Sequence, residues 1–164
     1  MLRSALRSSA LVVAIAAAAA SNAMAADCTV VRGHYDETAV PTPPCASPLG
    51  LCTAAQLSGP VKGNAFFTAS AIIPTADTPT TGVVFVTGDT TVSNAQFGNR
   101  QGTLFIKNAA AFRSIGDGDL TDTQVIVGGT GDFTGTTGSL RVVGTFDGLM
   151  GTGTMTFEGS ICFP

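Results

Sequence analysis

The sequence predicts an all-β protein folded as a small antiparallel closed β-barrel of about eight strands. From residue 61 onward Gly, Thr, Val and Phe dominate, and apolar residues nowhere recur at helical spacing over a dozen residues. Glycines stand inside the expected strands at Gly63, Gly144, Gly153 and Gly159. Such glycines permit the sharp coiling that a small barrel needs at its corners, and they favour a barrel over a sandwich of similar strand number.

The first 25 residues have the three parts of a secretory signal peptide: an N-terminal region with two arginines, the apolar run 10–20, and an A-x-A site that ends at Ala25. The run is about eleven residues long, shorter than the roughly 20 that a membrane-spanning helix requires. Asp27 stands where a lipobox needs a small residue, which argues against a lipid on Cys28. We expect cleavage after Ala25 and a secreted or periplasmic protein.

The mature chain has the size of one domain, with 139 residues left after cleavage. Residues 26–60 supply an N-terminal strand and a Pro-rich disulfide loop, and residues 61–164 supply the barrel body. Six basic and eleven acidic residues give the mature chain a net charge of −5, and it has one Tyr and no Trp. This composition disfavours nucleic acid and anionic membranes as partners.

Four cysteines lie in the mature chain, and an exported protein with an even number of cysteines most often pairs them. Cys45 and Cys52 flank a short loop that contains Pro and Gly, whereas Cys28 and Cys162 lie in the first and last expected strands. Of the three possible pairings we favour Cys45–Cys52 with Cys28–Cys162. A zinc site is disfavoured because the spacing is not C-x-x-C and the lone His34 fits no ligand pattern. No metal and no cofactor are expected.

The strands can be placed in chain order. The first is expected at residues 28–32, and a mostly irregular segment with five of the eight prolines follows at 34–60. Further strands are expected at residues 61–73, 82–87, 90–97, 103–107 and 123–127. The last two, at 138–146 and 151–161, form a hairpin, because the final strand alternates in polarity and Asp-Gly is a strong hairpin turn.

The stretch VGGTGDFTGTTG, residues 127–138, could be a phosphate cradle, a calcium turn or a corner between two strands. It is one residue out of register with G-x-G-x-x-G, and neither a helix nor a P-loop lysine accompanies it. Asp132 arrives one position early for the calcium-binding nonapeptide, which also occurs as a repeat. A corner fits best, because residues 125–127 end a strand, glycines supply positive φ and Gly138 opens the next strand.

This stretch resembles the GGTG-x-F-x-x-x-x-G strand-turn-strand signature of the allene oxide cyclase-like barrel proteins, a group that includes the plant dirigent proteins. The matching residues are Gly128, Gly129, Thr130, Gly131, Phe133 and Gly138. Weaker similarity runs from about Gly82 to the C-terminus, and the cysteine loop is not matched. The resemblance implies an eight-stranded, calycin-like barrel in a secreted protein of bacterial type. It also implies a homotrimer, the assembly of the plant proteins.

Residues 83–86 indicate self-association independently of the resemblance. The sequence Val-Val-Phe-Val is apolar on both parities of a strand, so both of its faces need cover. The barrel interior covers one face, and we expect a neighbouring subunit to cover the other, with the Pro-rich cysteine loop as the alternative cover.

The chemistry of the resembled proteins gives two expectations. Dirigent proteins steer the coupling of phenoxy radicals, and allene oxide cyclases close a fatty-acid epoxide into a cyclopentenone, both inside an apolar barrel cavity with a few polar residues. None of those polar residues can be placed in this sequence, so catalytic residues stay unassigned. A fold alone does not fix a function.

Two groups of polar residues are weighed as sites. Asp89 and Arg100 flank an expected strand and could face the barrel mouth, which makes them ligand-binding candidates, although charged strand ends are ordinary at a barrel rim. Asp117, Asp119 and Asp122 lack two of the ligands of an EF-hand loop, so a solvated turn is favoured.

The segment RGHYDET is a third candidate. Its His34, Tyr35, Asp36 and Glu37 could serve acid-base chemistry, but a loose polar loop is the favoured interpretation.

The sequence supports three functional hypotheses. The first is a secreted barrel that binds a small apolar ligand, because a single His and four paired cysteines disfavour most catalytic classes. The second is a dirigent- or cyclase-type enzyme that confines a reactive substrate, and the third is a structural or surface-interaction module. Ionisable side chains inside a sizeable apolar cavity would favour the enzyme. The presumed inner parity is mostly Val, Ile, Leu, Phe and Thr, which favours binding.

Overall fold

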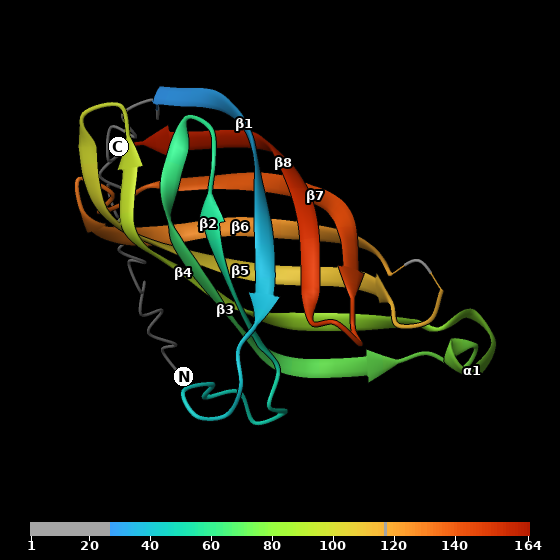
Figure 1. Ribbon diagram of the computed structural model, residues 1–164. Helices are drawn as coiled ribbons and strands as arrows, with labels where there is room; N and C mark the ends of the chain where they lie inside the picture. The colour runs from blue at the N-terminus through green and yellow to red at the C-terminus, as the bar shows by residue number, and fades with distance from the viewer. Residues whose placement is uncertain (1–26, 117) are drawn as a thin grey trace, which may run out of the picture.

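The computed structural model describes residues 27–116 and 118–164, which form one closed antiparallel barrel of eight strands in chain order (Figure 1). The strands are β1 (Asp27–Ala39), β2 (Cys52–Leu57), β3 (Val61–Pro74), β4 (Val83–Phe97), β5 (Arg100–Arg113), β6 (Asp119–Gly131), β7 (Thr137–Asp147) and β8 (Thr152–Phe163), with the short helix α1 (Thr78–Thr81) between β3 and β4. The predicted fold class is confirmed. The predicted signal peptide lies outside the described residues.

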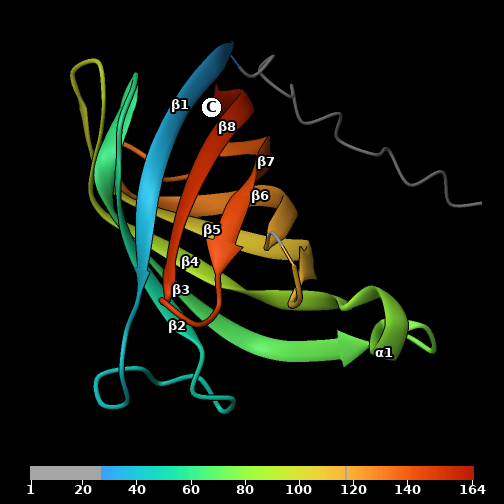
Figure 2. The ribbon, with the colours of Figure 1, turned by 45° about the vertical axis from the view of Figure 1, so that its right-hand side comes forward.

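The first and last strands close the barrel. They run side by side from the Asp27–Phe163 pair to the Thr38–Thr152 pair (Figure 2). The disulfide Cys28–Cys162 joins them near the chain ends, and Cys45–Cys52 closes the loop between β1 and β2. The described cysteines include no free thiol. The helix found in the described part of the chain falls short of the length and apolarity that crossing a membrane requires.

One continuous strand, β4, replaces two predicted strands. The break expected after residue 87 does not exist, because Gly88 lies within the strand and pairs with Ala69 and Asn108. A Cβ at Gly88 would lie 2.4 Å from the carbonyl oxygen of Thr68 and 2.5 Å from the ring of Phe67. This glycine therefore marks a close approach between two strands and not a turn.

The segment predicted to be mostly irregular, residues 34–60, contributes two stretches of strand. Residues 34–39 continue β1, and residues 52–57 form the whole of β2, so the prediction is correct only for the loop 40–51 and the turn 58–60. The Ser47 hydroxyl anchors this loop by donating a hydrogen bond to the carbonyl of Ala69, at 2.7 Å. Four of the five prolines belong to this loop and Pro60 to the turn between β2 and β3, while the alternating residues on either side of the loop belong to the barrel.

The glycine stretch is a corner, as predicted, although β6 runs four residues further than expected. It ends at Gly131, where φ is +61°, and the turn 132–136 leads into β7. Phe133, in this turn, is fully buried and packs against Phe163 with ring centroids 6.2 Å apart. The corner therefore delivers an aromatic side chain into the end of the barrel.

The barrel has one plugged end and one open end. At the plugged end Phe97 stacks on Phe163 at 5.6 Å between ring centroids, and Phe133 fills the remaining space. The opposite end, which we call the mouth, is bordered by the loops 40–51, 75–82 and 148–151 and by residues 114–116. Both ends of the described chain lie at the plugged end, because Asp27 pairs with Phe163.

The apolar run 83–86 alternates between the two sides of the barrel wall. Val86 is buried and lines the interior, whereas Phe85 is 46% exposed on the outside. Cover of the outer face by another subunit, and the expected homotrimer, stay predictions.

Candidate functional site

The barrel encloses a cavity of about 130 Å³. Its deep part is lined by buried apolar side chains: Val61, Val92, Leu104, Ile106, Ile126, Leu140, Phe157 and Ile161. Nearer the mouth the lining residues Leu51, Phe112, Leu120 and Phe146 are only half buried, so the cavity opens at this end. Its volume is close to the roughly 150 Å³ of an engineered apolar cavity that binds benzene, so it has room for about one small ring.

A connected group of polar side chains crosses the cavity wall on β4, β5 and β6. Thr90 donates a hydrogen bond to Asn108 at 3.0 Å, and the Asn108 amide donates to Oδ2 of Asp122 at 2.8 Å. The same oxygen accepts from the Gln124 amide at 3.0 Å, and Oδ1 accepts from the backbone N–H of Ala109 at 3.0 Å. Asp122 is only 5% exposed, and three donors hold its carboxylate in place.

A second polar group lies on β1 and β2. Tyr35 and Glu37 are two residues apart on β1, so both side chains point into the cavity. The Thr53 hydroxyl donates to Oε2 of Glu37 at 2.8 Å, across the β1–β2 pairing. Among the described residues no donor bonds the other oxygen, Oε1. The Tyr35 ring packs beside Phe157 with centroids 6.4 Å apart.

The environment raises the pKa of all three ionisable groups of the cavity. Burial is the largest cause for Glu37 and for Asp122, and the bonds from their donors only partly oppose it. The charge of Asp122 adds to the rise in the pKa of Glu37. Burial, followed by the charges of Glu37 and Asp122, also raises the pKa of the Tyr35 hydroxyl. None of these causes is a cation, and within residues 27–116 and 118–164 no Lys, Arg or His lines the cavity.

Replacing each carboxyl by its isosteric amide should change the stability of the protein in opposite directions for Glu37 and Asp122. We expect Glu37→Gln to raise the stability of the protein at pH 7, because the amide oxygen can still accept the Thr53 bond and no charge is buried. The folded state keeps the Glu37 proton above the ordinary pKa of 4.5, so ionisation destabilises the fold as pH rises above that value. The gain should therefore vanish near pH 3.5, as measured by thermal unfolding at both pH values.

Asp122→Asn is the contrasting variant. Its side-chain NH₂ would replace an oxygen that accepts from Ala109, or from Asn108 and Gln124, and would leave at least one buried donor unpaired. We expect a loss of about 1–3 kcal/mol at pH 7. If Glu37→Gln and Asp122→Asn changed the stability equally, this would contradict the conclusion that donors hold both oxygens of Asp122 but only one oxygen of Glu37.

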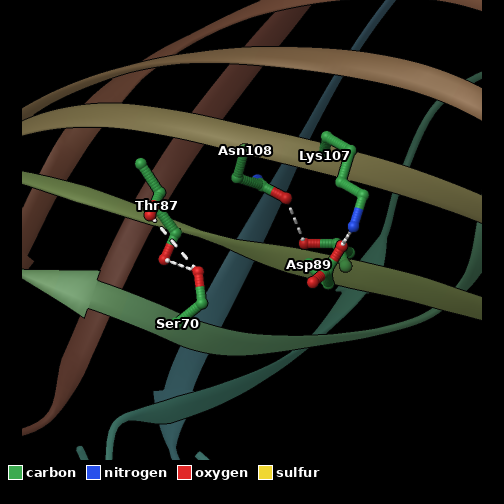
Figure 3. A network of polar contacts seen from close by, with 6 residues as sticks. Ser70, Thr87, Asp89, Lys107 and Asn108 are labelled. Carbon is green, nitrogen blue, oxygen red and sulfur yellow. Dashed lines mark hydrogen bonds and ion pairs between the residues drawn. The ribbon is translucent and has the colours of Figure 1, made fainter.

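The two ligand-binding candidates from the sequence lie away from the cavity. Asp89 is on the outer surface, where it forms an ion pair with Lys107 close to the hydrogen-bonded pair Ser70 and Thr87 (Figure 3). Arg100 lies at the plugged end, with its guanidinium carbon 4.0 Å from the centre of the Phe163 ring. The structure brings neither residue to the polar groups of the cavity.

Two interpretations of polar segments are corrected. His34 to Glu37 belong to β1 and not to a loose loop, and strand alternation turns Tyr35 and Glu37 inward while His34 and Asp36 stay exposed. Asp122 belongs to β6 and is buried, so it is not part of a solvated turn, whereas Asp119 is exposed and residue 117 is outside the described residues. No group of three or more His, Cys, Asp or Glu in the described chain could hold a metal ion.

Sequence reasoning missed Asn108 and Gln124 in the polar lining of the cavity, and it named Tyr35, Glu37 and Asp122 without placing them inside the barrel. A signal was present in the parity of the strands. Asp122 and Gln124 share parity with the buried Ile126, and Asn108 shares parity with the buried Ile106. Polar residues in register with buried apolar ones predict a polar patch inside a barrel.

Comparison with solved structures gave a structural likeness to a known protein. The chain is similar to the solved structure of a pterocarpan synthase dirigent protein, with 16% sequence identity, a TM-score of 0.47, and coverage of 87% of this chain and 88% of that chain. No family model and no curated protein matches the sequence. The function is therefore argued from the cavity itself.

Proposed function

We propose that the protein binds one small, largely apolar organic molecule inside its barrel. The single observation that carries this proposal is the cavity of about 130 Å³, which is apolar in its depth, polar at a few fixed points and open at the mouth. Ligand sites typically combine these features, because burial supplies affinity and a few polar groups fix orientation. The two disulfides are consistent with a secreted or extracellular protein.

A neutral one-ring probe tests the proposal. Toluene should shift the NMR resonances of lining residues and raise the melting temperature, because a ligand of the folded state stabilises it by mass action. Ala110→Leu narrows the cavity at a half-buried lining position, and we expect it to weaken toluene binding by about tenfold or more. Ala111→Leu, on the next residue outside the lining, is the matched control and should leave the affinity unchanged.

A second candidate function is confinement of a reactive substrate by a dirigent- or cyclase-type enzyme. The ionisable side chains Tyr35, Glu37 and Asp122 inside the apolar cavity favour it. A protonated carboxyl can donate to a substrate, and orientation alone supplies much of the rate enhancement in such reactions. Chiral analysis of phenoxy-radical products, formed with a one-electron oxidant in the presence of the protein, tests this candidate. A racemic product would argue against it.

A structural or surface-interaction module is the remaining hypothesis. It would be favoured if toluene produced neither a shift at the lining residues nor a change in melting temperature.

A further inference from the structure

The charges of the cavity are one-sided. Among the described residues two carboxyls, Glu37 and Asp122, line it, and no Lys, Arg or His does so. The cations placed by ion pairs or ring contacts are elsewhere: Arg32 pairs with Glu158 outside the barrel, Lys107 pairs with Asp89, and Arg100 covers the Phe163 ring at the plugged end. The interior therefore holds acceptors of positive charge without a cation of its own.

The two carboxyls differ in what they can offer to a ligand. Asp122 already accepts three hydrogen bonds, from Ala109, Asn108 and Gln124, and both of its oxygens are engaged. Glu37 accepts one bond, from Thr53, through Oε2 only. Its Oε1 has no bonded donor among the described residues and belongs to a cavity-lining side chain. Glu37 is therefore the carboxyl that a bound molecule can reach.

Aromatic rings lie beside this carboxyl. Tyr35 is on the same face of β1 as Glu37, and its ring lies 6.4 Å from that of Phe157, centroid to centroid. Ring faces attract organic cations, and the attraction increases when the cation is removed from water. A carboxylate next to aromatic rings in an apolar cavity is a combination suited to an ammonium group.

We propose that the cavity selects its ligand by charge: it takes a small apolar amine in its protonated form, places the ammonium group on Glu37, and rejects carboxylates of the same shape. This inference rests on the proposed binding function and names the chemical class of its ligand. The apolar part of the amine occupies the deep part of the cavity, and its ammonium group faces the mouth half, where Glu37 and Thr53 lie. A carboxylate would meet two acidic groups and no cation, so it is repelled.

Three probes with one ring and one substituent carbon separate the possibilities: benzylamine, benzyl alcohol and benzoate. Calorimetric titration at pH 7 and constant ionic strength should give benzylamine an affinity about tenfold or more above that of benzyl alcohol, with benzoate the weakest. In Glu37→Gln the affinity for benzylamine should fall to that of benzyl alcohol, while the affinity for the alcohol should stay within about twofold. Glu158→Gln removes the same charge from the outer surface and should leave the preference for the amine intact.

The outcomes distinguish this inference from the function on which it rests. Binding of toluene and benzyl alcohol without a preference for benzylamine would overturn the charge selection and leave the apolar binding function standing. A preference for the amine that survives in Glu37→Gln, or that is lost in Glu158→Gln, would overturn the role of Glu37. Failure of toluene and all three probes to bind would overturn the binding function itself.

Discussion

Replacing Cys28 and Cys162 together by alanine is expected to lower the free energy of unfolding by about 2–5 kcal/mol. This disulfide joins residues 134 positions apart, so in the unfolded chain it closes a loop that spans almost the whole barrel. Its removal lets the unfolded chain gain the conformational entropy that the long loop had withheld. Urea unfolding of the oxidised protein and of the variant, without reductant, measures the difference.

The other disulfide supplies the internal control. Cys45 and Cys52 are 7 positions apart, so the same entropy argument predicts a smaller effect for their double alanine variant, by about 2–3 kcal/mol. Equal losses from the two variants would show that loop length does not govern the contribution of these bonds. A Cys28/Cys162 variant as stable as the parent would contradict the predicted role of the bond outright.

Valine at Gly129 or Gly131 is expected to lower stability by about 1–3 kcal/mol or more, for two different reasons. At Gly129 a Cβ would lie 2.2 Å from the backbone oxygen of Thr103 and 2.7 Å from the Cβ of Phe133, and neither atom can move without disturbing the plug. At Gly131 the φ of +61° is unfavourable for a β-branched residue, and the backbone oxygen of Gln101 is 2.6 Å from the Cβ position.

Gly148→Val is the matched control for both variants. A Cβ at Gly148, in the loop between β7 and β8, would have no heavy atom within 4 Å, so the change should stay within about 0.5 kcal/mol. Thermal unfolding of the three variants under one condition decides the matter. If the Gly129 and Gly131 variants were as stable as the wild type, the glycines would not be required for the fold, and another role, such as letting a ligand approach the backbone, would be indicated.

The fold class could be predicted from the sequence because it depends on features that are local. Glycines within alternating strands and the absence of helical periodicity can both be recognised before it is known which strands pair. Strand boundaries were harder to predict. Gly88 has the same local sequence pattern whether it forms a turn or makes room for the ring of Phe67 on the neighbouring strand β3. Pairing with the neighbouring strand decides between a turn and a close approach, and the register of that pairing cannot be read from the local sequence.

The cavity was harder to predict than the fold for a related reason. Tyr35 and Glu37 stand beside a Pro-rich loop, and their polar neighbours His34 and Asp36 suggest solvent on every side. The pairing of β1 with β8 gives this segment its extended conformation, and that pairing joins residues from opposite ends of the chain. Non-local pairing therefore decided which polar side chains turned inward.

The positions of the chain ends have a practical consequence for orientation. Asp27 and Phe163 pair at the plugged end, and Pro164 continues from there, on the far side of the barrel from the mouth. If the protein is attached to a sensor surface through Pro164, the plugged end should therefore face the surface and the mouth of the cavity should face the solution. Attachment through the loop 148–151 would reverse this orientation and place the entrance against the surface. The site of attachment should thus decide whether a ligand in solution can reach the cavity.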